Sequence, residues 1–64
     1  MKVKYVEFVN EKIGTINHRI NFILEKIKKR FDIVSVQQNL AISESGVVKI
    51  TSFTILYKDK SDGL

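Results

Sequence analysis

Catalytic chemistry has few side chains to draw on in this sequence. Its 64 residues include one histidine, His18, and no cysteine, so one chain cannot build a typical tetrahedral zinc site or supply a thiolate. No Glu-x-x-His pair, glycine-rich phosphate loop or Ser/His/Asp arrangement is evident along the chain. The sequence therefore predicts a protein that is not an enzyme, with no catalytic residues, no metal site and no cofactor.

Positive charge is the stronger chemical signal. Eleven Lys and Arg residues against seven Asp and Glu residues give a formal net charge of +4 and an isoelectric point near 9.6. This balance argues against mimicry of DNA and suits a nucleic acid or a small phosphorylated molecule as the partner. The densest basic patch comprises Lys26, Lys28, Lys29 and Arg30. Alternatively, this patch is only the solvated C-terminus of a helix, where positive charges interact favourably with the helix dipole.

One aromatic side chain stands apart from the predicted core. On a helical wheel Phe22 lies about 180° from the isoleucine stripe described below, between His18 and Lys26 and beside Arg19. We treat Phe22, His18 and Arg19 as candidates for contact with a ligand or partner, because an aromatic ring is a typical interface anchor. The alternative is a tolerated exposed ring beside a surface histidine.

Hydrophobic periodicity predicts a strand followed by a long helix. Residues 3–9 are rich in β-branched and aromatic types, which favours a strand. Asn10 is the expected helix N-cap, with Glu11 in the first turn. The predicted helix has about 20 residues and spans about 30 Å. Its apolar stripe covers about 100° of one face and comprises Ile13, Ile16, Ile20, Ile23, Leu24, Ile27 and Phe31.

Two further strands and a turn complete the chain. Residues 33–42 and 47–58 have the composition of strands, and the turn at 43–46 has Gly46 available for a positive φ. A right-handed crossover makes the first two strands parallel, and placing the third between them makes every neighbouring pair antiparallel. The predicted fold is therefore α+β, in β-α-β-β order, with a three-stranded antiparallel sheet (order 1-3-2) and one long helix packed on one face.

The hairpin register decides what each sheet face carries. Pairing Ile42 with Val47 segregates the apolar residues best, whereas a three-residue loop with a glycine bulge would mix the faces. In the first register the helix face carries Val34, Val36, Leu40, Ile42, Val47, Phe53, Ile55 and Tyr57. The opposite face carries Ile33, Ala41, Val48, Ile50 and Leu56 around a polar row of ligand or interface candidates, namely Ser35, Gln37, Asn39, Ser52 and Thr54.

The small size of the chain predicts assembly. One helix on one sheet face leaves about 3–5 kcal/mol of net stability at this length, and disulfides are excluded by composition. The large apolar groups on the second face are too many to leave in water in one patch. We therefore expect that face, or the sheet edge, to meet a second copy in a homodimer or higher oligomer. A partly wet open face is the alternative.

Domain boundaries and location follow from the same composition. We expect one small α+β domain at residues 1–58 and a polar C-terminal tail at 59–64. Glu7 interrupts the apolar run that a signal peptide would need, and no stretch approaches about 18 apolar residues. The chain is predicted to be cytoplasmic, with no membrane partner.

The chain as a whole resembles a known group of proteins. Its element order, the segment from Asp32 to Gln37 and the ending from Ser52 to Lys58 are similar to those of very small sporulation-associated proteins of Firmicutes, which have phage-carried relatives. The resemblance covers nearly all the chain, consists of hydrophobic pattern and length, and implies no catalytic residues. The same element order resembles dodecins, oligomeric flavin-binding proteins. Because the chain lacks the Trp that dodecins stack on flavin, this second resemblance implies assembly and no flavin.

Together these features predict a non-enzymatic, homo-oligomeric binding protein. It would be a bacterial or phage accessory factor that binds or sequesters a small anionic, nucleotide-like ligand at a subunit interface. One alternative is a small basic nucleic-acid-binding regulator that uses residues 26–30. Another is a structural sporulation-associated protein without a ligand. Salt separates the first two hypotheses, because nucleic-acid binding weakens steeply as salt rises.

Overall fold

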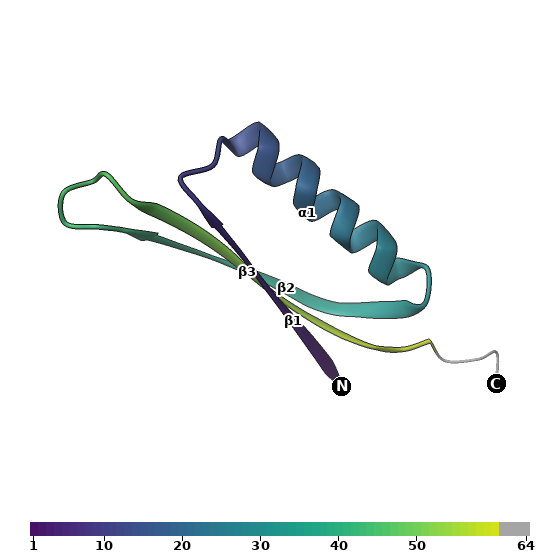
Figure 1. Cartoon of the computed structure of the whole chain (residues 1–64). Helices are drawn as coiled ribbons and strands as arrows, with labels where there is room; N and C mark the ends of the chain where they lie inside the picture. Colours follow the sequence, from purple (N-terminus) through teal and green to yellow (C-terminus); the bar gives the residue numbers. More distant parts are fainter. Residues whose placement is uncertain (61–64) are drawn as a thin grey trace.

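A three-stranded sheet carries one helix over part of its length (Figure 1). This computed structural model describes residues 1–60. The elements follow the chain as β1 (Lys2–Val9), α1 (Ile13–Lys28), β2 (Phe31–Ile42) and β3 (Lys49–Asp59). The strand order is β1-β3-β2, and both neighbouring pairs are antiparallel. The α+β prediction is therefore confirmed, including its strand order. Residues 61–64 of the predicted tail lie outside the described residues.

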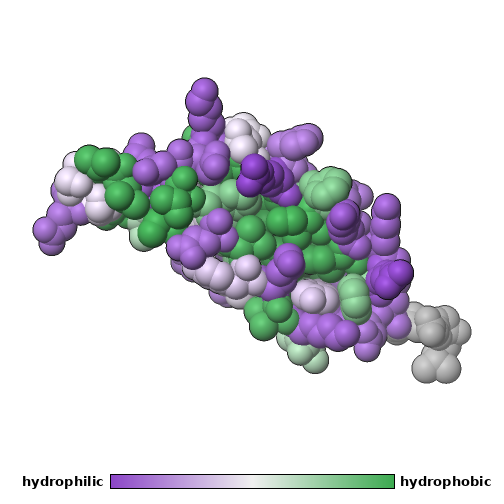
Figure 2. Space-filling view, in the orientation of Figure 1, coloured by the Kyte–Doolittle hydropathy of each residue, from purple (hydrophilic) through white to green (hydrophobic). Residues whose placement is uncertain are grey.

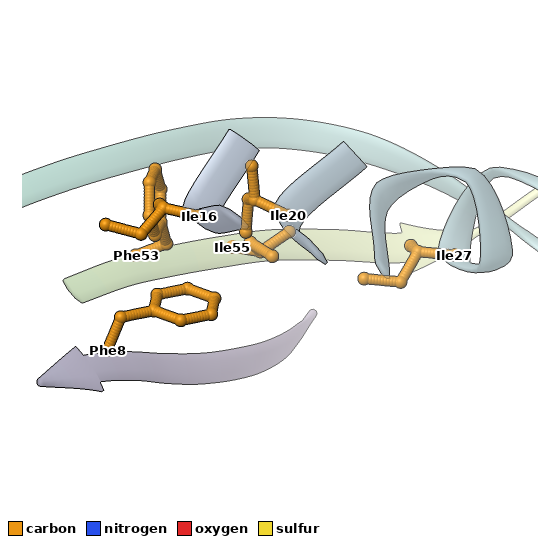
Figure 3. Packing of buried hydrophobic residues seen from close by; sticks show 6 residues of the cluster. All are labelled: Phe8, Ile16, Ile20, Ile27, Phe53 and Ile55. Atoms are coloured by element: carbon orange, nitrogen blue, oxygen red, sulfur yellow. The ribbon is translucent and has the colours of Figure 1, made fainter. Parts of the chain in front are cut away.

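The core lies between α1 and the strands β1 and β3. Its buried members come from three elements and comprise Phe8, Ile16, Ile20, Ile27, Phe53 and Ile55. Figure 3 shows these side chains gathered in the space between the helix and the two strands. Ile55 is completely buried, and the rings of Phe8 and Phe53 meet edge to face at 6.0 Å, a favoured aromatic geometry. Five members of the predicted stripe thus face the sheet, namely Ile16, Ile20, Ile23, Leu24 and Ile27. Ile13 is instead 76% exposed, and Phe31 belongs to β2, because the helix ends at Lys28.

The start of the helix differs from the prediction. Asn10 is not the N-cap, because α1 begins at Ile13 with Lys12 as its cap residue, and Glu11 lies before the helix. Asn10 instead has a left-handed backbone with φ of 52°, a conformation that asparagine tolerates better than most residues. Its Oδ1 accepts the Lys49 N–H at 2.7 Å, and its own N–H donates to the Lys49 carbonyl at 2.8 Å. Asn10 therefore ties the end of β1 to the start of β3.

The hairpin register differs from the predicted one by two residues. Ile42 pairs with Lys49 and Val36 with Ile55, so the predicted pairing of Ile42 with Val47 is wrong. The turn accommodates the extra residues through hydrogen bonds from Ser43 N–H to the Val48 carbonyl at 2.9 Å and from Gly46 N–H to the Ser43 carbonyl at 2.8 Å. Gly46 has φ of 73°, as predicted. Val47 and Val48 precede β3 and belong to neither face of the sheet.

A β-bulge at Val34 changes the faces at the other end of the hairpin. Ile33 pairs with Tyr57, whereas Ser35 pairs with Leu56, so Val34 is the additional residue. A bulge reverses the alternation of side chains beyond it. Ile33 consequently packs against the core, although it was predicted on the opposite face. Val34 was predicted under the helix and is instead 46% exposed.

The helix is shorter than the hairpin that it covers. With 16 residues, α1 is about 24 Å long, whereas the 12 residues of β2 span about 40 Å. The helix of about 20 residues that the sequence predicts is therefore too long. The turn end of the hairpin projects beyond the helix (Figure 1), and we call residues 40–49 the arm. At the base of the arm, Leu40 and Lys49 line a hollow with the first turns of α1. Leu40, Ile42 and Val47 were predicted on the helix face, but in the arm they are 63%, 55% and 71% exposed.

The projecting arm gives the molecule an extended shape. Its principal extents are 53 × 20 × 10 Å and its radius of gyration is 14.1 Å, whereas a compact chain of this length has a radius near 11 Å. Hydrophobic residues gather at the arm and along the strip between helix and sheet in Figure 2. Among the described residues, no helix is both long and apolar enough to cross a membrane.

Candidate ligand-binding groove

A groove runs between the helix and the β1 side of the sheet. It has a volume of about 360 Å³ and is lined by Lys4, Phe22, Ile23, Lys26, Ile27, Phe31 and Tyr57. Two lysines and three aromatic rings thus line one hollow, and no carboxylate is among its lining residues. We call this hollow the cationic groove.

Lysines lie directly over aromatic rings at this groove. Lys26 Nζ lies 4.7 Å from the centre of the Phe22 ring, and Lys2 Nζ lies 4.8 Å from the centre of the Phe31 ring. Both distances are within the range of cation–π attraction, about 6 Å. These contacts hold each ammonium group beside a ring, which places positive charge and aromatic surface side by side.

The alternation of β1 places Lys4 in the groove and Lys2 on the same face of the sheet, over the ring of Phe31. Lys2 pairs with Tyr57 and Lys4 with Ile55, and cross-strand partners point to the same face of a sheet. Both lysines therefore lie on the helix face, in the same row as the core residue Phe8. Their alkyl stems can cover apolar surface while the ammonium groups reach solvent.

The bulge in β2 places the ring of Phe31 in the groove. Because side-chain alternation is reversed beyond Val34, Phe31 shares the helix face with Tyr57. The two rings meet at 66° with their centres 5.0 Å apart, and both are only partly buried. Without the bulge Phe31 would point to the opposite face, and the groove would lose one wall.

Charge compensation at the groove is weak. The carboxylate of Asp59 lies 3.7 Å from Lys2 Nζ, and both side chains are more than half exposed. Exposed ion pairs of this kind contribute about 0–1 kcal/mol, so an anionic ligand can compete for Lys2. Lys4 and Lys26 have no carboxylate partner among the ion pairs of the described residues.

The three residues of the helix that were candidates for ligand or partner contact lie in or close to this groove. His18, Arg19, Phe22 and Ile23 line a second hollow of about 420 Å³ on the helix, so Phe22 and Ile23 belong to both hollows. Phe22 is 58% exposed, as its position on the wheel predicted. It does not point directly away from the sheet, however, because it lines the groove with Lys4, Phe31 and Tyr57. The structure therefore joins Phe22, His18 and Arg19 into one continuous surface with Lys26.

The predicted basic patch is only partly in the groove. Lys26 lines it, while Lys28 ends α1 and neither Lys28, Lys29 nor Arg30 is among the lining residues. All these basic side chains are exposed. The other three basic residues of the patch therefore lie near the groove but do not line it, so they can serve as controls for Lys26. They are Lys28, Lys29 and Arg30.

The predicted polar row forms a separate surface on the other side of the sheet. Gln37 pairs with Thr54 and Asn39 with Ser52, while Ser35 pairs with Leu56. Cross-strand pairing places all these polar side chains on the face opposite the buried Phe53 and Ile55. The Ser35 hydroxyl is buried without a hydrogen-bond partner in the described part of the chain. The row is thus brought together as predicted, but away from the basic residues.

Sequence reasoning missed Lys2, Lys4 and Phe31 as site residues. The alternation of Lys2, Lys4, Val6 and Phe8 in the first strand was a signal that lysines share a face with the core. Tyr57 was assigned to the core, and it is indeed half-buried. Phe31 could be placed in the groove only with knowledge of the bulge at Val34.

Comparisons with known protein families, with curated proteins and with solved structures found no match. Within residues 1–60, no group of His, Asp or Glu side chains could hold a metal ion. The groove itself is therefore the feature from which a function can be inferred. Its side chains can attract an anion and contact the face or edge of a planar ring.

Proposed function

We propose that the protein is a non-enzymatic, homo-oligomeric binding protein for a small anionic, nucleotide-like ligand. The ligand is held in the cationic groove of one chain, whereas the sequence alone predicted a site at a subunit interface. The protein acts in the cytoplasm as an accessory factor of a bacterium or a phage, a role that its resemblance implies. The observation that supports the ligand most strongly is the joint placement of Lys4, Lys26 and Phe22 with Phe31 and Tyr57 in one groove.

The groove favours a ligand that carries both a charge and a ring. Lysine ammonium groups attract phosphate from any direction, and this attraction alone would not select a nucleotide. Phe22, Phe31 and Tyr57 add apolar ring surface, which stabilises a nucleobase by about 1–3 kcal/mol per stacked base in other proteins. A volume of about 360 Å³ is at the lower end of small-molecule sites.

Calorimetric titration with AMP, adenosine and inorganic phosphate tests whether the groove recognises a charge and a ring together. AMP contains both a ring and a charge, whereas the other two probes each lack one. We expect AMP to bind at least about tenfold more tightly than either, a difference of about 1.4 kcal/mol. Equal binding of AMP and phosphate would show that the rings contribute nothing, and the proposed ligand class would be wrong.

Two variants and a matched control locate the site. Lys26→Ala and Phe22→Ala should each weaken AMP binding about tenfold, a loss of about 1.4 kcal/mol. Lys28→Ala removes the same charge from the same helix outside the groove and should leave the affinity within about twofold. Equal losses from Lys26→Ala and Lys28→Ala would indicate attraction to net charge and contradict a defined groove.

A nucleic-acid-binding regulator is the second candidate, because Lys28, Lys29 and Arg30 follow Lys26 at the end of the helix. Titration with a single-stranded oligonucleotide at several salt concentrations separates the two functions. A nucleic-acid site that neutralises several phosphates shows a steep log–log salt slope, about −0.7 per contact for single strands. A steep slope that becomes shallower in Lys29→Ala would favour this second function over the first.

A further inference from the structure

Within residues 1–60, the outer edge of β2 is the longest strand edge without a partner strand. Because β3 lies between β1 and β2, each outer strand leaves one row of backbone N–H and C=O groups without a strand partner. β1 has 8 residues and β2 has 12. Such an edge is a template for pairing with another chain unless charges or bulges block it.

The two edges differ in how they are protected. β1 carries Lys2, Lys4 and Glu7 within its short length, and charged side chains are a common protection against edge pairing. The stretch from Ser35 to Ile42 in β2 carries no charge and lies beyond the bulge at Val34. A copy with a charge of +4 repels another copy, so approach along a strand without Lys or Arg has the lowest electrostatic cost.

We infer that two copies of the chain pair through antiparallel β2 edges, between about residues 35 and 42, to form a continuous six-stranded sheet. Antiparallel pairing of identical strands places a two-fold axis perpendicular to the sheet, so both helices lie on the same face. This inference supplies the assembly that the proposed function includes. It concerns a surface separate from the cationic groove.

This arrangement covers the apolar residues of the arm. Because the paired strands run in opposite directions, each arm lies beside the part of the partner that carries its helix. Leu40 and Ile42 of the arm, and Val36 before the arm in β2, are on the helix face and are 63%, 55% and 42% exposed. The partner's helix presents the flank that carries Leu24, which lies two turns from Asn17 on the same side of α1. Asn17 lines a hollow with Gln38 and Leu40, which shows that this flank is directed toward β2.

The exposed area of the single chain agrees with a missing partner. The chain exposes 5105 Å², whereas a folded monomer of this mass exposes about 4200 Å². The excess is therefore at most about 900 Å², close to the roughly 800 Å² that each partner buries in a standard interface.

Sedimentation velocity of the full chain and three variants tests the inference. The wild type should sediment as a dimer, with twice the 7.4 kDa mass of one chain, at micromolar concentration. Leu40→Lys and Ile42→Lys introduce a charge at exposed edge positions and should each sediment as a monomer that keeps its circular dichroism spectrum. Tyr5→Lys is the matched control, because Tyr5 is 59% exposed on β1, and it should remain a dimer.

Each contrary result overturns the inference. A wild-type chain that sediments as a monomer excludes the dimer directly. Dissociation by Tyr5→Lys with no effect of Leu40→Lys and Ile42→Lys would assign the interface to the sheet face that carries the polar row. AMP titration of the Leu40→Lys monomer reports on the groove separately, so a failure of the ligand proposal is distinguishable from a failure of the β2 interface.

Discussion

The two ends of the β2–β3 hairpin each carry an isoleucine on the helix face, in very different surroundings. Ile55 at the covered end is completely buried beneath α1, whereas Ile42 in the arm is 55% exposed. Both are isoleucines on the same face of the sheet, as the pairing of Val36 with Ile55 and Ile42 with Lys49 shows. The difference arises because α1 packs over Ile55 but does not extend over Ile42. Burial in this molecule is set by the reach of the helix as much as by residue type.

The largest expected difference between the two ends concerns these isoleucines. Ile55→Ala should reduce the free energy of unfolding by about 2–5 kcal/mol, because it leaves a cavity in the core. Ile42→Ala should cost less than about 1 kcal/mol at concentrations where the chain is a monomer, because its side chain is already largely hydrated. Urea denaturation of both variants measures the comparison. Equal losses would show that the arm is covered within a single chain.

The link between β1 and β3 should have the next largest effect. Asn10→Ala removes the acceptor for the Lys49 N–H and places a residue with a Cβ but no polar group in a left-handed conformation. We expect a loss of about 1–2 kcal/mol from the missing hydrogen bond and the backbone strain together. Thermal unfolding measures this loss. An unchanged melting temperature would mean that the β1–α1 connection does not depend on Asn10.

The smallest effects, with opposite signs, are expected at two glycines. Gly46 has φ of 73° in the arm's turn, and Gly14 lies within α1 with open space around the position of a Cβ. Gly46→Ala should therefore destabilise the protein by about 1 kcal/mol, while Gly14→Ala should stabilise it by about 0.5–1 kcal/mol through helix propensity. Paired thermal melts check the signs. Stabilisation by Gly46→Ala would show that the turn has another conformation.

The fold was predictable where periodicity and topology rules act together. The helical stripe around Ile16, Ile20 and Ile27 has the period of a helix, and a right-handed crossover leaves only a few orders for the strands. The length of the helix was not predictable from this pattern. Asn10 has the composition of an N-cap, but its side chain bonds to a strand that lies 39 residues further along the chain.

The candidate site was predictable only in the part that lies on the helix. Phe22 and Lys26 are one turn apart, so their proximity follows from sequence alone. Lys4, Phe31 and Tyr57 come from three strands, and their meeting depends on the register of two strand pairs. The bulge at Val34 has no local sequence signal such as a glycine, so the contribution of Phe31 to the groove required the structure.

Amide hydrogen exchange of the full chain tests the central claim most directly, because it compares the two edges within one sample. The account predicts that amides of residues 35–42 in β2 are protected and that their protection increases with protein concentration. Outward-facing amides of β1 should exchange quickly at every concentration, since that edge has no partner. Fast, concentration-independent exchange along the whole outer edge of β2 would contradict pairing of two copies and leave the arm uncovered.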